Sequence, residues 1–221
     1  MSPTPFRRIP YREAMFKYGS DKPDLRIPFE IIDLSDIFEN SDFKPFRGVT
    51  VRGIKVPDLA IKSNSWFNEV VDYAKSIGMP GIGYITIQDD MSFKGPIDKF
   101  LTEKDKADLI ERADLSVGSV LFFIADKNEL QASKQAGQIR LYLGRKLDLL
   151  DPNRFEFCII NDFPMFEYDS DVGHYIFTHN PFSMPQGGME SLNNKNPEDV
   201  LAYQYDFVCN GIELVSGAVR N

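Results

Sequence analysis

Hydrophobic residues recur along the chain with two periods, and these periods predict its helices and strands. Apolar spacings of three or four residues, which put side chains on one face of a helix, occur in residues 11–18, 64–78, 102–114 and 128–150. In residues 64–78 we expect Asn64 or Ser65 to cap the helix and Gly78 to end it. In residues 128–150 we expect Gly137 to weaken the helix and Gly144 to break it.

Strands are predicted where short apolar runs or alternating patterns occur, in residues 29–34, 47–56, 81–88, 118–126 and 155–164. Gly53 changes the phase of the alternation in residues 47–56 and is expected to mark a β-bulge. Near the end of the chain, two further strands are joined at Asn210-Gly211, a dipeptide typical of tight hairpin turns. Residues 186–200 are rich in glycine, asparagine and polar residues, and they are predicted to form a loop.

The order of these elements predicts a mixed fold, α+β or α/β, with an inserted unit. Residues 29–154 alternate between strands and helices and resemble a compact α/β domain. Residues 1–28 and 155–221 differ from this insert in their residue pattern. They are predicted to be the edges of a second fold that both segments share. Whether the strands of the insert run parallel or antiparallel cannot be decided from the pattern.

Composition and charge narrow the functional classes. The 221 residues are 43% hydrophobic and 26% charged, with a net charge of −8. Nucleic-acid binding driven mainly by positive charge is therefore not expected. The small basic group Arg7, Arg8 and Arg12 is more typical of a solvated terminus than of a binding site. Cys158 and Cys209 lie in apolar stretches, which predicts buried thiols in a reducing, cytoplasmic compartment. The sequence contains no run of about 20 apolar residues, so no membrane span is predicted. The first residues do not resemble a signal peptide.

Four motifs, in order, carry a resemblance to a known family. They are GSDKPDLR (19–26), DFPMFEYD (162–169), THNPFSMP (178–185) and YDFVCNGIELVSGAVR (205–220). Together they resemble the central stretch of bacterial-type aspartyl-tRNA synthetases, and the insert is similar to the GAD domain of that family. The resemblance implies a GAD-type α/β insert beside part of the antiparallel sheet of a class II synthetase.

The resemblance also implies an activity and its partners. Enzymes of this family activate L-aspartate with ATP, in the presence of Mg²⁺, and transfer the aspartyl group to tRNA(Asp); they are cytoplasmic homodimers. The stretch represented here would follow the anticodon-binding barrel, the dimer motif and the Arg-x-Glu loop, and would precede the last ATP-binding motif. The chain is therefore expected to be a fragment that is inactive by itself, and no catalytic residue is assigned within it.

Two residues are expected to bind aspartate. Arg220 matches the family's arginine that recognises the side-chain carboxylate, a role suited to the planar guanidinium fork. His179 matches a histidine on a loop that reaches the bound amino acid. Many members carry a second, adjacent histidine where this chain has Asn180, which can donate a hydrogen bond but cannot become a cation.

Two carboxylates are expected to serve ATP and its metal. Glu213 matches the family's glutamate that contacts ATP through Mg²⁺, and Asp206 on the preceding strand is a plausible second ligand, because Mg²⁺ binds one or two carboxylates together with phosphates and water. Glu213 and Arg220 are seven positions apart, an odd number that would place them on opposite faces of a regular strand. A bulge or twist is therefore expected between them, at Ser216-Gly217.

Several residues leave alternatives open. Ser20, Asp21, Lys22 and Asp24 could contact a ligand or tRNA, or lock the insert to the core, but turn chemistry alone would also explain them. Trp66 is better explained as core than as a base-stacking platform, and His174 receives no role. With two histidines and two cysteines scattered along the chain, no zinc site is expected. Two other functions remain possible: a non-catalytic GAD-type tRNA-binding module of an amidotransferase-like protein, and a structural scaffold.

Overall fold

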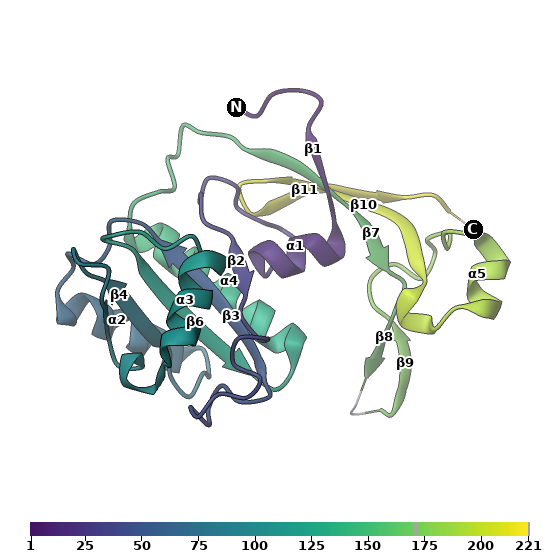
Figure 1. The fold of residues 1–221 in the computed structure, drawn as a ribbon. Coiled ribbons are helices and arrows are strands. Elements are labelled where there is room, and N and C mark those ends of the chain that lie inside the picture. The colour runs from purple at the N-terminus through teal and green to yellow at the C-terminus, as the bar shows by residue number, and fades with distance from the viewer. Residues whose placement is uncertain (170–171, 221) are drawn as a thin grey trace. The chain divides into compact units, whose positions relative to one another are not determined.

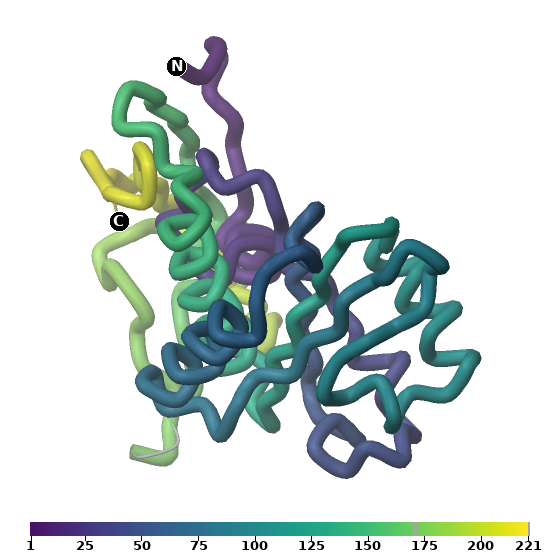
Figure 2. Tube along the Cα trace, turned by 90° about the vertical axis from the view of Figure 1, so that its left-hand side faces the viewer, coloured from purple at the N-terminus to yellow at the C-terminus, as the bar shows by residue number. Residues whose placement is uncertain are grey.

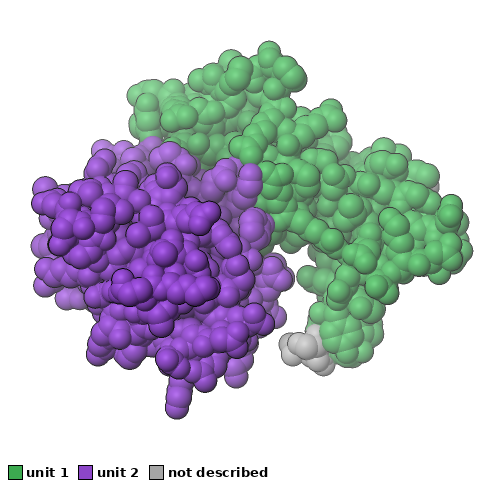
Figure 3. Space-filling view, in the orientation of Figure 1, with its two compact units in different colours: residues 1–15, 21–26, 151–221 green, residues 16–20, 27–150 purple. Residues whose placement is uncertain are grey.

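The computed structural model describes residues 1–169 and 172–220, which form two compact units of mixed α and β structure (Figures 1 and 3). The first unit contains residues 1–15, 21–26 and 151–221, and the second contains residues 16–20 and 27–150. The chain therefore passes between the units several times. Each unit has its own main sheet.

The sheet of the first unit joins segments from both ends of the chain. Its strand order is β1-β7-β10-β11, with bounds Arg7–Pro10, Phe157–Pro164, Leu201–Cys209 and Ile212–Ala218. β1 runs parallel to β7, whereas the other neighbours are antiparallel. An antiparallel class II-type sheet was expected, and the parallel β1 strand at its edge is an addition to that expectation.

Smaller elements surround this sheet. Helix α1 covers Tyr11–Tyr18, as the apolar spacing predicts, and β8 (Phe166–Asp169) pairs with β9 (His174–Phe177) in a separate hairpin. The prediction of a loop at residues 186–200 is wrong in part, because these residues include helix α5 (Gly188–Asn194) and a 3₁₀ turn at Pro197–Asp199. The pattern missed α5 because the helix has only seven residues, and Gly188, Asn193 and Asn194 at its ends have low helical propensity.

The second unit is built on an antiparallel sheet with helices on both faces. The strand order is β2-β3-β6-β4-β5, with bounds Ile31–Asp33, Thr50–Val56, Val120–Asp126, Gly83–Ile87 and Phe93–Lys94. The helices are α2 (Asn64–Ser76), α3 (Glu103–Arg112) and α4 (Glu129–Lys146), with a 3₁₀ turn at Asp98–Phe100. Figure 2 shows α2 and α4 side by side.

The central strand β6 explains this layered arrangement. Its residues alternate between two cores: Phe122 packs with residues of α2 and α4, whereas Phe123 packs with residues of α3. Both phenylalanines are buried. A strand that is apolar at every position, such as VLFFIAD, is suited to a sheet that is covered on both faces.

Three local expectations for this unit are wrong. Helix α2 is capped by Ser63, whose hydroxyl accepts a hydrogen bond from the Trp66 amide, and not by Asn64 or Ser65. Gly53 marks no bulge, because β3 and β6 stay in register; it lies instead where a Cβ would come within 2.6 Å of a Leu34 methyl group. Helix α4 also continues through Gly144 without the expected break, whereas the weakening effect of Gly137 stays a prediction.

Other predictions concern single side chains. Cys158 and Cys209 are free, buried thiols, as predicted. Trp66 is half-buried, packs against the core beside Phe67 and has the Lys146 ammonium 5.1 Å from its ring centre. No helix in residues 1–169 or 172–220 combines the length and the apolar character that crossing a bilayer requires.

Candidate active site

Three carboxylates converge on one ammonium group in the first unit. Nζ of Lys22 lies 2.7 Å from Oδ2 of Asp21, 3.3 Å from Oε2 of Glu213 and 3.9 Å from Oδ2 of Asp206. Burial disfavours the charged lysine, but the hydrogen bonds to Asp21 and Glu213 and the charges of Asp21 and Asp206 more than offset it and raise the pKa of Lys22. The cluster thus joins the GSDKPDLR loop to the two C-terminal strands.

Asp206 is the buried member of this cluster. Only 4% of the residue is exposed, and its Oδ1 atom has no hydrogen-bond partner. Burial, together with the neighbouring charge of Glu213, raises the pKa of Asp206 to about 6, although Lys22 partly offsets the shift. A buried carboxylate oxygen without a donor is costly in an isolated protein, so this atom is suited to a ligand that brings positive charge.

A β-bulge brings Glu213 to the side of the sheet where Asp206 lies. Between β10 and β11, Phe207 lies opposite Val215 and Val208 lies opposite Glu213, so Leu214 is an extra residue. Residues directly opposite each other share a face, and residues two apart on a strand also share one. Glu213 therefore lies on the face of Val208 and Asp206. The expected irregularity exists, but it is at Leu214 and not at Ser216-Gly217, where the register is regular.

The hairpin turn has the geometry that its sequence predicts. Asn210 and Gly211 both have positive φ, at 51° and 83°. Asn210 also accepts a hydrogen bond from the Glu156 amide through its side-chain oxygen. These contacts fix the start of β11 and, with it, the position of Glu213.

Arg220 belongs to a second set of contacts, beyond the end of β11. It forms an isolated bridge with Ser183, and its guanidinium donates a hydrogen bond of 3.3 Å to Oδ1 of Asn180. The HNPF loop (residues 179–182) and the end of the terminal strand are therefore neighbours. These are the two segments in which residues that bind aspartate were expected. Glu213 and Arg220 are not in contact with the same partners, because Glu213 pairs with Lys22.

His179 packs between aromatic rings. Its ring centre lies 4.8 Å from that of Phe163 and 5.5 Å from that of Tyr11, both at steep angles. The residue keeps an exposed side, but this packing dehydrates the imidazole and lowers the pKa of His179. The charges of Asp21, Lys22 and Glu213 also act on the ring, so His179 lies near the Lys22 cluster.

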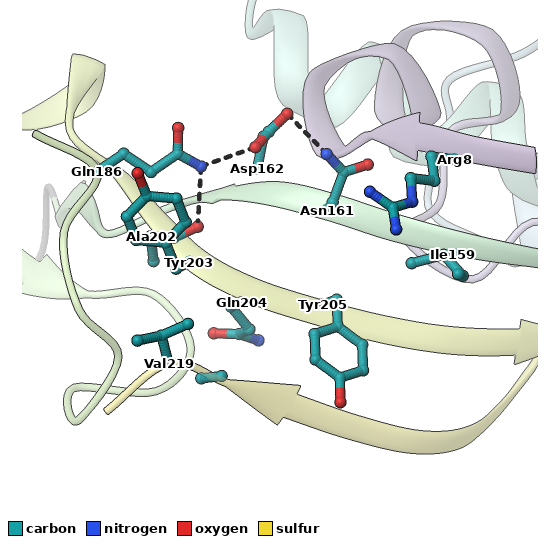
Figure 4. A pocket seen from close by; sticks show the side chains of 11 residues that line it. Arg8, Ile159, Asn161, Asp162, Gln186, Ala202, Tyr203, Gln204, Tyr205 and Val219 are labelled. Carbon is teal, nitrogen blue, oxygen red and sulfur yellow. Dashed lines mark hydrogen bonds between the residues drawn. The ribbon is translucent and has the colours of Figure 1, made fainter. Parts of the chain in front are cut away.

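The open cleft in Figure 4 lies on the other face of the same sheet. It has a volume of about 600 Å³, and its lining includes Ile159, Asn161 and Tyr205. Tyr205 lies opposite Asn161 and next to Asp206 in sequence, so its side chain points away from the Asp206 face. At one end of the cleft, the Gln186 amide donates a 2.7 Å hydrogen bond to Asp162. The cleft is therefore distinct from the carboxylate cluster.

The remaining candidates have structural partners. Asp24 is buried and forms a two-pronged ion pair with Arg26, at 2.7 and 3.0 Å, so turn chemistry explains it. Ser20 lies just after α1, in the second unit. Among the arginines near the N-terminus, Arg7 pairs with Glu13 and Arg12 pairs with Asp199, both at exposed positions, and Arg8 lines the cleft of Figure 4. His174 is exposed on β9.

Two residues of the site were undervalued from the sequence. Lys22 was weighed only as one of four turn residues, and Tyr11 only as part of the apolar face of a helix. A sequence signal for Lys22 does exist, because a lysine between Asp21 and Asp24 adds charge beyond what a turn requires. No local signal identifies Tyr11, because its contact with His179 joins residues that are 168 positions apart.

Comparison with known proteins decides the family. The family model of the class II tRNA synthetases (D, K and N) matches residues 1–221. This chain is a class II tRNA synthetase sequence. It is 49% identical, over 99% of its length, to the aspartate–tRNA ligase of Streptomyces coelicolor, and 50% identical, over its full length, to the aspartate–tRNA(Asp/Asn) ligase of Rickettsia felis. The aspartate–tRNA(Asp/Asn) ligase of Ehrlichia chaffeensis is 48% identical over 98% of the chain.

The class II synthetase chain spans only part of these relatives. It covers 37% of the Streptomyces and Ehrlichia enzymes and 38% of the Rickettsia enzyme. The predicted family is thus confirmed for the whole of the present chain. The mixed α+β fold with antiparallel sheets is confirmed as well.

Proposed function

We propose that this chain is the central part of an aspartate–tRNA ligase, which reacts L-aspartate with ATP to give aspartyl-adenylate and pyrophosphate and then transfers the aspartyl group to tRNA(Asp) with release of AMP. The observation that carries the proposal is the convergence of Lys22, Asp206 and Glu213 on one face of the β10–β11 hairpin, near His179. Relatives that match nearly the whole chain are named aspartate–tRNA ligase or aspartate–tRNA(Asp/Asn) ligase. The same proposal includes that the whole ligase binds tRNA(Asp), forms a homodimer and is cytoplasmic.

In the proposed mechanism, Arg220 binds the side-chain carboxylate of aspartate. An arginine presents two parallel N–H donors that match a carboxylate, so it favours an acidic amino acid over a neutral one. Asn180, which accepts a hydrogen bond from Arg220, holds the guanidinium near the HNPF loop. His179, supported by Tyr11 and Phe163, is a second donor toward the amino acid.

The two carboxylates of β10 and β11 are suited to the Mg²⁺ that accompanies ATP. Asp206 offers a buried oxygen without a partner, and Glu213 offers a partly exposed one. Among the described residues no group of three or more potential ligands forms a complete metal site. This agrees with a cation that is held by one or two carboxylates and otherwise by phosphate oxygens and water. Such a cation would neutralise charge on the phosphates during attack by the aspartate carboxylate.

The test is aspartate-dependent exchange between ATP and pyrophosphate in the longer ligase that contains residues 1–221. Arg220→Lys should raise the KM for aspartate about 100-fold, because a two-pronged charged contact is lost. Glu213→Gln should lower exchange at saturating aspartate. Arg112→Lys is a matched control, since Arg112 also forms a fork with a carboxylate, that of Asp36, but in the other unit.

Two results would contradict the proposal. One is unchanged exchange in both the Arg220→Lys and Glu213→Gln enzymes. The other is robust aspartate-dependent exchange by the 221-residue chain alone, since the chain spans only 37–38% of the relatives it matches. The alternative of a tRNA-binding module without ligase activity predicts the first result, and it leaves the β10–β11 carboxylates without a role.

A further inference from the structure

We propose that the ammonium group of Lys22 is a built-in counter-cation for Asp206 and Glu213, which positions both carboxylates when no divalent cation is present and competes with that cation for them. The identity of the natural cation, the Mg²⁺ that comes with ATP, rests on the proposed function. The competition itself concerns only residues of this chain.

The contacts of Lys22 support this role. Its Nζ atom lies 3.3 Å from a Glu213 oxygen and 3.9 Å from an Asp206 oxygen, and it is 2.7 Å from Asp21. A lysine ammonium is a compact point charge with three donors and can serve several carboxylates at once, whereas an arginine fork pairs best with one. Lys22 thus links two strands of the sheet to the loop that carries it.

The burial of Asp206 explains why a counter-cation is needed. The side chain is almost completely buried, its Oδ1 atom has no donor, and Glu213 adds a second negative charge nearby. Two carboxylates that share one site repel each other and lose hydration. An adjacent ammonium offsets both effects, so Lys22 can keep the pair together before any ligand arrives.

The loop of Lys22 is held against the hairpin, which keeps the ammonium in place. A Cβ on Gly211 would lie 3.5 Å from Cβ of Asp24 and 3.7 Å from the carbonyl oxygen of Lys22, so the turn of the hairpin packs on this loop. The loop is braced from within by the ion pair between Asp24 and Arg26. Lys22 is therefore placed by backbone packing as well as by its own charge.

A divalent cation would use the same two carboxylate groups and would be repelled by the ammonium. Two like charges a few ångströms apart repel each other, and the repulsion is several times stronger near a protein surface than in bulk water. Removing the charge of Lys22 should therefore strengthen cation binding, while a residue that only supports the fold would weaken it or leave it unchanged. This difference in sign makes the proposal testable.

The experiment measures Mn²⁺ binding to the 221-residue chain by titration calorimetry, with Mn²⁺ as the probe. We expect Lys22→Met to bind Mn²⁺ about tenfold more tightly than the parent chain. We expect Lys22→Arg to bind about as weakly as the parent, and Asp206→Asn to lose binding. Without metal, Lys22→Met should melt at a lower temperature than the parent, and Mn²⁺ should restore most of the difference. Lys17→Met, which removes an ammonium paired with Glu30 in the second unit, is the control and should change neither quantity.

A second measurement uses the unmodified chain, in case Lys22→Met does not fold. Mass spectrometry after brief reductive methylation should show faster modification of Lys22 when Mn²⁺ is present, because the cation displaces the ammonium from the carboxylates. Equal or slower modification would overturn the proposal, as would Mn²⁺ affinity in Lys22→Met no greater than in the parent.

The two proposals fail in different ways. If the parent binds Mn²⁺ through Asp206 but Lys22→Met binds it no more tightly, only the role of Lys22 is rejected. If Asp206→Asn has no effect on Mn²⁺ binding, the metal role of the carboxylates is rejected, and the competition falls with it.

Discussion

Gly137 of helix α4 lies against Gly19, at the end of α1, with no room for a side chain between them. A Cβ on Gly137 would lie only 2.5 Å from the Gly19 carbonyl oxygen. Gly19 itself has φ of 65°, a conformation that favours glycine, and both residues belong to the second unit. The pair allows the backbone that follows α1 to pack directly on the middle of α4.

This close approach predicts that Gly137→Ala destabilises the chain, contrary to helix propensity. Alanine in place of a mid-helix glycine normally stabilises by roughly 1 kcal/mol. Here the added methyl group meets backbone that cannot rotate away, so we expect a loss of about 1–3 kcal/mol in urea unfolding. Gly81→Ala is the matched control, because a Cβ there would meet nothing within 4 Å. A gain in stability for Gly137→Ala would contradict the packing argument.

Some features of this fold are determined by residues that are close in sequence, and others by contacts between distant residues. The helix at Tyr11–Tyr18 and the turn at Asn210-Gly211 follow from apolar spacing and from backbone preferences, so they could be predicted. The role of Gly137 could not, because the pattern showed only a weak helix former. Its partner is Gly19, which is distant in sequence, and propensity scales contain no such contact.

The candidate site shows the same division between local and long-range determinants. Glu213, Asp206, His179 and Arg220 were selected as candidate ligands by their place in motifs, which does not depend on geometry, and their roles stay predictions. The bulge at Leu214 was placed wrongly, since register is set by the pairing of β10 with β11 and the small residues Ser216-Gly217 are only a weak guide. The convergence of Lys22 on the carboxylates needs the fold itself, because it joins residues 184 and 191 positions apart.

The ion pair between Asp33 and Arg52 predicts a pH-dependent part of stability. Arg52 is 1% exposed at its side chain, and its guanidinium lies 2.6 Å from Asp33. Partial burial opposes the charge on Asp33, but hydrogen bonds from Ser35 and the charge of Arg52 hold the pKa of Asp33 below its ordinary value. Stability from such a group is present above the unfolded pKa, about 3.9, and is lost as pH falls through the lower folded pKa.

Asp33→Asn should therefore destabilise the chain at pH 7 by about 1–2 kcal/mol, a value reduced from that of a fully buried pair because Asp33 is partly exposed. The difference from the parent should shrink toward zero below about pH 4. Urea unfolding at pH 7 and at the lowest pH where both proteins fold would measure it. Asp89→Asn serves as an exposed control, and a difference that stays constant with pH would count against the electrostatic explanation.

The two cysteines are predicted to be unreactive in the folded chain. Burial raises the pKa of Cys158 to about 11 and also raises that of Cys209. Since only the thiolate is nucleophilic, iodoacetamide at pH 8 should label both residues much more slowly in buffer than in denaturing urea. Rapid labelling of Cys158 under native conditions would mean that β7 opens readily.

The packing of Tyr11 on His179 predicts a change in the titration of this histidine. The chain has two histidines, so NMR can follow both, and exposed His174 provides an internal reference. Packing against Tyr11 and Phe163 lowers the pKa of His179, because the dehydrated ring disfavours the charged form. Tyr11→Ala should rehydrate the ring and move this pKa upward toward about 6.5. Tyr11→Phe keeps the aromatic ring and should leave it nearly unchanged. If Tyr11→Phe instead raised the pKa as much as Tyr11→Ala, the hydroxyl group of Tyr11 rather than its ring would control His179.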